Sequence, residues 1–196
     1  MQPLRSPQNA GADLRDEAFE IIRKKSFFRG EITLASGRKS DFYFDMKPTM
    51  FTPAGAHALA ELLLERLATV RPDYVAGVAV GAIPLVSNVT MLSAAKGRPL
   101  PGFFVRKDVK DHGTKRKLDG LAHDASLAGK RVAIVEDVTT TGGSSMIAVN
   151  AAREAGAEVV LVLSIVDRGE GAAETYREAG VPFASLFTAD EFKDAK

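Results

Sequence analysis

The stretch VAIVEDVTTTGGS, residues 132–144, decides the fold that we predict for this chain. Its first four residues are apolar and typical of a short buried strand, and two carboxylates, Glu136 and Asp137, follow at the carboxyl end. Three threonines, two glycines and a serine come next, and after Ser145 apolar residues recur at helical spacing. The pattern predicts a strand, a hydroxyl-rich turn and a helix. Because ligands of open α/β sheets bind where strands end and helices begin, we expect a site here.

The chemistry of the turn suits a phosphate monoester. Gly142 and Gly143 permit positive φ and a close approach of the backbone to a ligand, and N–H groups at a helix start bind anions. Carboxylates repel a phosphate and instead suit hydroxyl groups or a cation beside it, so a ribose 5-phosphate satisfies both halves of the motif. The alternative is a structural turn with ordinary capping residues, which the acid pair and hydroxyls in register disfavour. The hydroxyl donors are Thr139, Thr140, Thr141 and Ser144.

This stretch resembles the phosphoribosyl-pyrophosphate (PRPP) motif of the type I phosphoribosyltransferases. It lacks the Gly-Lys-Ser/Thr of a P-loop and the G-x-G-x-x-G of a dinucleotide fingerprint. The resemblance implies that the two acids hold the ribose hydroxyls and that the turn holds the 5-phosphate. The PRPP-binding residues implied here are Glu136, Asp137, Val138, Thr139, Thr140, Thr141, Gly142, Gly143 and Ser144.

Length and composition bound the remaining possibilities. The 196 residues are enough for one α/β domain with a substantial core, and a net charge of +1 implies no polyanion partner, so we expect no nucleic acid to bind. Three histidines and no cysteine exclude a disulfide framework and a thiolate metal site. No apolar run approaches the roughly 20 residues of a membrane helix. We expect a cytoplasmic protein without membrane contact.

The amino-terminal part predicts a small unit outside the main α/β pattern. Residues 14–28 have the apolar spacing of an amphipathic helix, which Gly30 is expected to end. Residues 31–47 alternate around a Ser-Gly-Arg turn and predict a hairpin-like pair. The sequence LASGRKSDFYFD resembles that of the hood that covers the base in orotate phosphoribosyltransferases. A surface hairpin with aromatic packing is an equal alternative on this segment alone.

The remaining pattern predicts a Rossmann-like α/β fold, in which helices flank a central parallel sheet. Thr52 and Pro53 start a helix that runs to about Thr69. The resemblance implies a single domain over residues 1–196, with a hood at about 14–50 and a core at about 51–187. It also implies that the turn at 79–84 holds the pyrophosphate, often through a non-proline cis peptide. We expect strands at 74–78, 102–105, 159–166 and 183–187, and helices from this turn to about Lys96, at 174–179 and at 188–192.

A basic segment, RKDVKDHGTKRKLDG, follows the strand at 102–105. Few apolar residues anchor it to a core. It can be a solvated charged hairpin, a nucleic-acid contact that lacks interleaved aromatics, or a mobile lid that brings positive charge to a polyphosphate. Its R-K-x-x-K-x-H-G pattern resembles the catalytic loop of orotate phosphoribosyltransferases, which favours the lid. The resemblance implies PRPP-binding and catalytic roles for Arg106, Lys107, Lys110 and His112, with Asp137 as a further catalytic residue.

Arg168 follows the apolar run at 159–166, again at the expected functional edge. An exposed cation at a helix start is one interpretation, but the helix dipole mildly disfavours it. The orotate family has an arginine here that contacts the base carboxylate. The resemblance therefore implies that Arg168 and Thr140 bind orotate.

The implied reaction converts orotate and PRPP into orotidine 5′-monophosphate (OMP) and pyrophosphate in pyrimidine biosynthesis. Mg²⁺ is the implied cofactor; it arrives on PRPP, and no direct protein ligand to the metal is expected. The implied assembly is a homodimer in which the basic loop, residues 106–117, serves the neighbouring subunit. A purine phosphoribosyltransferase and a PRPP-sensing regulator of the same fold are the alternatives. The basic loop and Arg168 argue against the first, and a weakly basic amino-terminal segment argues against the second.

Overall fold

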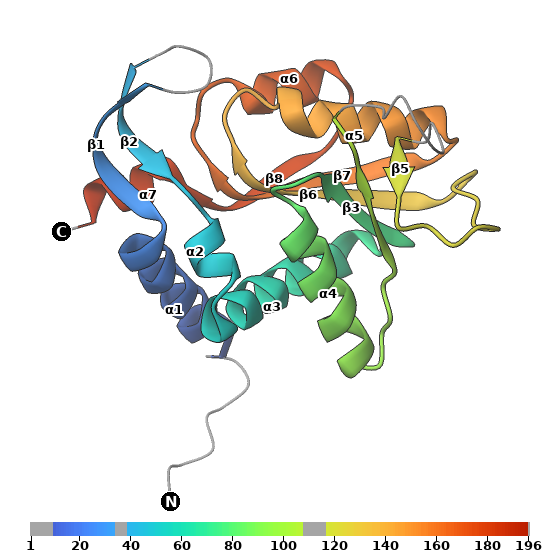
Figure 1. The fold of residues 1–196 in the computed structure, drawn as a ribbon, viewed down its shortest axis with the longest axis horizontal. Coiled ribbons are helices and arrows are strands. Elements are labelled where there is room, and N and C mark those ends of the chain that lie inside the picture. Colours follow the sequence, from blue (N-terminus) through green and yellow to red (C-terminus); the bar gives the residue numbers. More distant parts are fainter. Residues whose placement is uncertain (1–9, 34–38, 108–116, 196) are drawn as a thin grey trace, which may run out of the picture.

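The centre of the molecule is a six-stranded sheet with the order β5-β4-β3-β6-β7-β8, beside a separate two-stranded sheet, β1-β2 (Figure 1). The computed structural model describes residues 10–33, 39–107 and 117–195. All neighbours in the large sheet are parallel except β4 and β5. Its strands are β3 (Tyr74–Val78), β4 (Gly102–Val105), β5 (Leu118–Asp119), β6 (Arg131–Thr139), β7 (Glu158–Asp167) and β8 (Phe183–Thr188).

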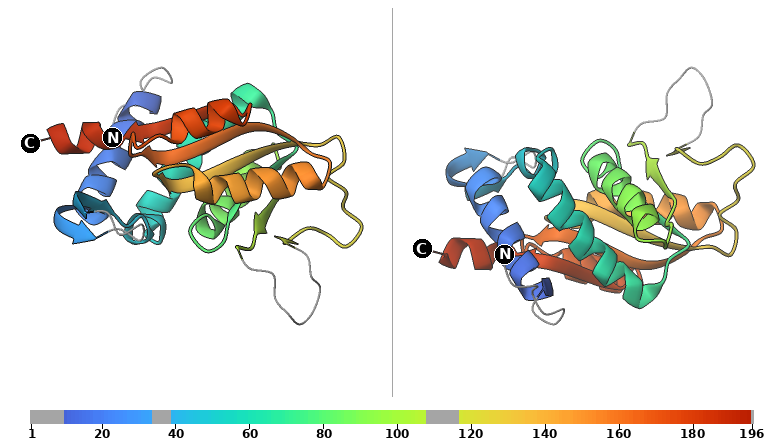
Figure 2. Two further views of the ribbon diagram at one scale, coloured as in Figure 1. Left: turned by 90° about the horizontal axis from the view of Figure 1, so that it is seen from above. Right: turned by 90° about the horizontal axis from the view of Figure 1, so that it is seen from below.

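Helices cover both faces of the large sheet (Figures 1 and 2). Helices α3 (Pro53–Val70) and α4 (Ile83–Ala95) lie on one face, and α5 (Gly143–Glu154) and α6 (Ala172–Glu178) on the other. Because successive strand residues point to opposite faces, Ala133 and Val135 of β6 join the apolar core with α3 and α4. Val132 and Ile134 join the core with α5 and α6. The apolar run predicted as a buried strand therefore divides between two cores.

The amino-terminal unit, which we call the hood, contains α1 (Ala10–Lys25), β1 (Phe27–Thr33), β2 (Lys39–Phe44) and α2 (Lys47–Met50). The carboxyl-terminal helix α7 (Ala189–Asp194) packs against it. Phe192 of α7 stacks on Phe19 with ring centroids 4.4 Å apart and meets Phe44 edge-on at 5.2 Å. Aromatic contacts between elements at the two ends of the chain thus attach the hood to the core.

The hood and the loops hold the main departures from the sequence-based expectations. The first helix ends at Lys25, and Gly30 lies inside β1 instead of ending the helix. The reason is that Phe27 pairs with Phe44 across the antiparallel hairpin, where their rings pack 5.0 Å apart. Strand β6 also runs on through the acid pair to Thr139, because it pairs with β7 up to that residue. The short elements α2 and β5 were not anticipated.

Two local features place the turn between β3 and α4. The side chain of Thr52 accepts a hydrogen bond from the Gly55 N–H, so it caps α3 as predicted. At Gly77, an added Cβ would lie 2.3 Å from the Ala82 Cβ and 2.7 Å from the Val135 carbonyl oxygen. Only glycine therefore lets β3 approach both β6 and the start of α4, which brings this turn beside the acid pair.

Candidate active site

Three loops meet where β3, β6 and β7 end. The strands are parallel, so their carboxyl ends lie at one edge of the sheet. Val138 pairs with Val166, and Thr139 pairs with Asp167. Just beyond these pairs, the Arg168 N–H donates to the Thr139 carbonyl oxygen at 2.9 Å. The hydroxyl-rich turn and the Arg168 loop, predicted separately, are therefore direct neighbours.

The hydroxyl-rich turn has the geometry of an anion site. Gly142 adopts φ +85° and caps α5, and its carbonyl oxygen accepts the Met146 N–H at 3.0 Å. Tyr176 of α6 is fully buried beneath the turn, and an added Cβ at Gly142 would lie 3.0 Å from its Cζ. Thr141 and Gly143 are exposed. The amino end of α5 thus opens to solvent on a rigid base, as phosphate binding requires.

The first acid, Glu136, is buried, and its side chain is 2.6 Å from the Ser145 hydroxyl, which donates to it from α5. Burial raises the pKa of Glu136 to about 8, and the negative charge of Asp137 adds to the effect, whereas the Ser145 hydrogen bond and nearby Lys107 oppose it. In the ligand-free protein at neutral pH, this carboxyl therefore favours its neutral form.

The second acid, Asp137, lies at the turn that follows β3. Its carboxylate is so close to Gly81 that an added Cβ there would stand 3.2 Å from Oδ1 and 3.3 Å from Oδ2. Oδ1 also accepts the Val138 N–H at 2.9 Å, which fixes the side chain. The Ala79–Val80 peptide of this turn is cis, and Val80 is 77% exposed. The predicted pyrophosphate turn, with the predicted type of peptide bond, thus faces Asp137.

The structure describes only the base of the basic segment. Arg106 forms an ion pair with Asp119 through Nε at 2.9 Å and Nη2, and its guanidinium lies over the Phe104 ring. Lys107 is exposed and close enough to influence the pKa of Glu136. Lys110 and His112, to which we assigned catalytic roles, lie outside the described residues.

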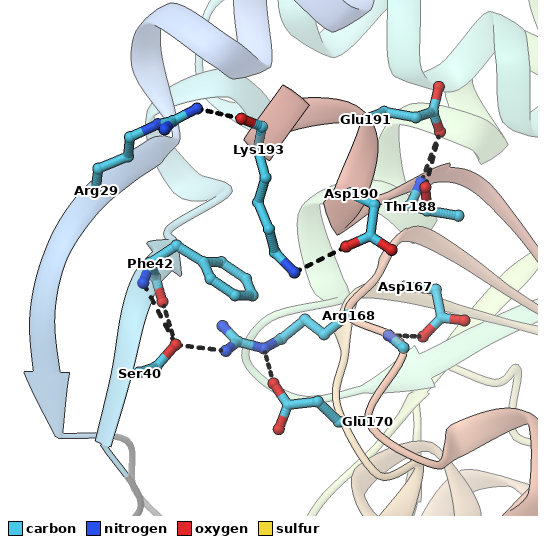
Figure 3. Close-up of polar contacts among 11 residues, drawn as sticks. Arg29, Ser40, Phe42, Asp167, Arg168, Glu170, Thr188, Asp190, Glu191 and Lys193 are labelled. Atoms are coloured by element: carbon cyan, nitrogen blue, oxygen red, sulfur yellow. Dashed lines mark hydrogen bonds and ion pairs between the residues drawn. The ribbon is translucent and has the colours of Figure 1, made fainter. Parts of the chain in front are cut away.

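Arg168 is buried between its own loop and the hood (Figure 3). The helix that follows begins only at Ala172, so Arg168 is not the exposed cation at a helix start. Its Nε donates to Glu170 at 2.7 Å, its Nη2 donates to Ser40 of β2 at 3.1 Å, and its Cζ lies 4.2 Å from the centre of the Phe42 ring. The hood thus contacts the residue to which we assigned the base.

Sequence reasoning did not single out Ser145, Tyr176 or Glu170. Ser145 and Tyr176 lie on helices whose side chains reach the site only through tertiary packing. Glu170 carried one local signal, a charge of opposite sign two residues after Arg168. Ser40 and Phe42 stand at positions i and i+2 of a predicted strand, so their side chains were expected on the same face.

A groove of about 1130 Å³ lies elsewhere, lined by Leu14 of α1 and by residues of α3, α4 and the loops that follow them. Arg71 and Pro72 precede β3, and Pro99 and Leu100 precede β4. The groove is therefore at the amino ends of the strands, opposite the three loops. In the residues that the structure describes, no group of three metal-binding side chains occurs, and no helix is long and apolar enough to span a bilayer.

The fold and the three loops define a phosphoribosyltransferase. The family model of the phosphoribosyl transferase domain matches residues 50–184. An orotate phosphoribosyltransferase of Bradyrhizobium diazoefficiens is 57% identical and covers 92% of this chain and 97% of the relative. One of Rhodopseudomonas palustris is 59% identical over 88% of this chain and 92% of the relative. The chain belongs to the orotate phosphoribosyltransferase family.

A solved structure agrees with this placement. The orotate phosphoribosyltransferase of Mycobacterium tuberculosis in complex with PRPP matches with a TM-score of 0.75 and 32% identity. The match covers 92% of this chain and 99% of that one. The Rossmann-like fold with a central, mostly parallel sheet and flanking helices is thereby confirmed as the type I phosphoribosyltransferase fold.

Proposed function

We propose that this chain transfers the ribose 5-phosphate group of PRPP to orotate, giving OMP and pyrophosphate in pyrimidine biosynthesis. Besides family membership, one structural observation supports orotate as the base. The buried guanidinium of Arg168 lies one residue beyond the strand pair that ends at the phosphate turn. A base that carries a carboxylate is the substrate that such a cation suits, whereas adenine and hypoxanthine have none.

Different loops at this edge of the sheet bind different parts of PRPP. The turn within residues 138–144 holds the 5-phosphate through the N–H groups at the start of α5 and the hydroxyls of Thr140, Thr141 and Ser144, and the turn at Val80 and Gly81 receives the pyrophosphate. As the C1–pyrophosphate bond breaks, positive charge develops on the ribose ring. Asp137, held by the Val138 N–H beside this turn, lies where its carboxylate stabilises that charge and binds a ribose hydroxyl. Glu136 contributes the second ribose contact from the α5 side.

The cations of the basic segment neutralise the negative charge of the departing pyrophosphate. Pyrophosphate gains negative charge as it departs, and Lys110, His112, Lys107 and Arg106 are the residues proposed to neutralise it. Of these, the charge of Lys107 opposes the raised pKa of Glu136, and Arg106 would exchange its Asp119 partner for phosphate. Arg168 and Thr140 hold the base.

Mg²⁺ is the proposed cofactor, bound to PRPP oxygens. The donor set fits, because Mg²⁺ prefers oxygen ligands, keeps several waters and is held by one or two carboxylates together with substrate phosphates. The carboxylate of Asp137 beside Gly81 would contact the ion through its bound water, and no direct protein ligand is proposed. When bound, the ion would supply positive charge to the pyrophosphate oxygens.

The proposed assembly is a cytoplasmic homodimer with the basic loop, residues 106–117, shared across the interface. The loop connects β4 to β5, and β5 is an edge strand of the large sheet. The described strand at the carboxyl end of the loop therefore lies at an edge of the sheet. The chain has no cysteine, so its fold needs no oxidising compartment.

An assay of the purified chain with orotate, PRPP and Mg²⁺ tests the proposed function. We expect OMP and pyrophosphate in equal amounts, and loss of turnover when a chelator removes Mg²⁺. The matched control is Asp137→Asn, which keeps the size of the side chain and removes its charge. Absence of OMP under these conditions, or equal turnover by the Asn variant, contradicts the proposal.

A further inference from the structure

Arg168 forms an ion pair with Glu170, a residue to which the proposed reaction gives no role. Its side chain is only 3% exposed, and that of its ion-pair partner Glu170 is 22% exposed. Surface ion pairs contribute little, but a buried guanidinium without a counter-charge is strongly unfavourable. Glu170 therefore supplies the negative charge that compensates the buried guanidinium and holds it in place before any substrate binds.

The geometry of the guanidinium shows what Glu170 leaves open. Glu170 accepts from Nε and Ser40 accepts from Nη2, while the Phe42 ring supports the guanidinium at 4.2 Å (Figure 3). Within the described part of the chain, Nη1 makes no hydrogen bond. A guanidinium binds a carboxylate best through two parallel N–H groups. With Nε occupied, the end formed by Nη1 and Nη2 remains for such a bidentate contact.

The backbone around this pair is also fixed. The Arg168 N–H donates to Thr139, and the Gly169 N–H donates to the Asp167 carboxylate at 2.9 Å. Ser40 in turn donates to the Phe42 carbonyl oxygen at 2.9 Å, so the hood residues beside Arg168 are held as well. The remaining freedom is rotation of the Arg168 side chain, and Glu170 is the charged group that restricts it.

We propose that Glu170 is a positioning residue that orients Arg168 for a carboxylate-bearing pyrimidine and thereby sets the preference for orotate over uracil. This inference rests on the proposed function, in which Arg168 contacts the base carboxylate. Glu170 does not touch the substrate. It acts through Arg168, so its effect is confined to ligands that carry the carboxylate.

The test compares two nucleotides that differ only in that group. OMP and UMP share the ribose 5-phosphate, and UMP lacks the carboxylate, so the ratio of their dissociation constants isolates the contact. Calorimetry on the full chain measures both. Glu170→Ala should reduce the preference for OMP by at least about tenfold, the scale of one charge-assisted hydrogen bond. The dissociation constants of UMP and PRPP should stay within about twofold of wild type.

Three further single variants and one double variant separate the possible roles. Glu170→Gln keeps an acceptor for Nε but removes the negative charge, so its preference for OMP should lie between those of wild type and Glu170→Ala. Glu174→Ala removes the partner of Arg177 in an exposed pair on α6, so it controls for loss of any nearby ion pair and should change nothing. Arg168→Ala should abolish the preference, and adding Glu170→Ala to it should have no further effect, because the two residues act as one unit.

The outcomes distinguish the inference from the function on which it rests. If Arg168→Ala abolishes the preference and Glu170→Ala leaves it at the wild-type value, the positioning role is refuted and the base contact stands. A further loss in the double variant refutes action through Arg168. If Arg168→Ala itself leaves the preference unchanged, both the base contact and the role of Glu170 are refuted. Thermal unfolding of each variant confirms that binding is measured on folded protein, and Glu170→Gln serves if the alanine variant is unstable.

Discussion

Replacement of Gly142 by alanine should damage the phosphate turn without touching any charged group. Gly142 adopts φ +85°, a conformation that costs a residue with a Cβ roughly 1–2 kcal/mol. The new Cβ would also stand 3.0 Å from Cζ and 3.2 Å from the hydroxyl oxygen of Tyr176. Tyr176 is fully buried and cannot move aside, so the turn must shift away from it.

This cost has two measurable forms. If the turn stays in place, the free energy of unfolding falls by about 1–2 kcal/mol. If the turn relaxes, PRPP loses N–H contacts, and the same free energy corresponds to a roughly 5- to 30-fold weaker dissociation constant. Urea unfolding and calorimetry with PRPP measure the two effects.

Gly143→Ala is the matched control. Gly143 does not adopt a positive φ, and an added Cβ would have the Thr141 hydroxyl oxygen as its nearest neighbour at 3.9 Å. We expect wild-type unfolding for this variant. The reasoning is refuted if Gly142→Ala matches wild type in both stability and PRPP binding, or if Gly143→Ala is itself less stable than wild type.

Three further predictions concern charge. Asp137→Asn should lose most activity while its urea unfolding stays that of wild type, because Asp137 lies at a strand end; near-normal turnover contradicts its assigned role. Because burial raises the pKa of Glu136 from 4.5 to about 8, its ionisation destabilises the fold, and wild type should lose stability relative to Glu136→Gln as pH rises through this window. If the difference in free energy of unfolding between the two proteins, measured in urea, does not change with pH, this prediction for Glu136 is contradicted. Mixing inactive Lys110→Ala and Asp137→Asn proteins should restore about a quarter of wild-type activity through mixed dimers with one intact site; no recovery after confirmed subunit exchange refutes the shared loop.

The sequence was informative where one local pattern carries both structure and chemistry. The apolar run before Glu136 predicts the central strand, and the glycines and threonines after it predict the turn. Arg168 was expected at the same edge because parallel strands end together, and the pairing of Thr139 with Asp167 places it there.

The environment of each site residue was not predictable from local pattern. Glu136 is buried against Ser145 of a neighbouring helix, which depends on how α5 packs on β6. The burial of Arg168 depends on the hood, whose position follows from the aromatic contacts of α7 at the other end of the chain. Gly30 was misjudged because a turn signal after a helix and an irregular position in a strand both favour glycine.

Competition among bases tests the central claim most directly. The purified chain is supplied with PRPP, Mg²⁺ and equal concentrations of orotate, uracil, hypoxanthine and adenine, and the nucleotides formed are separated and quantified. The account predicts OMP as the dominant product, with one pyrophosphate released for each OMP formed. Dominant formation of a purine nucleotide, or consumption of PRPP without OMP, contradicts it.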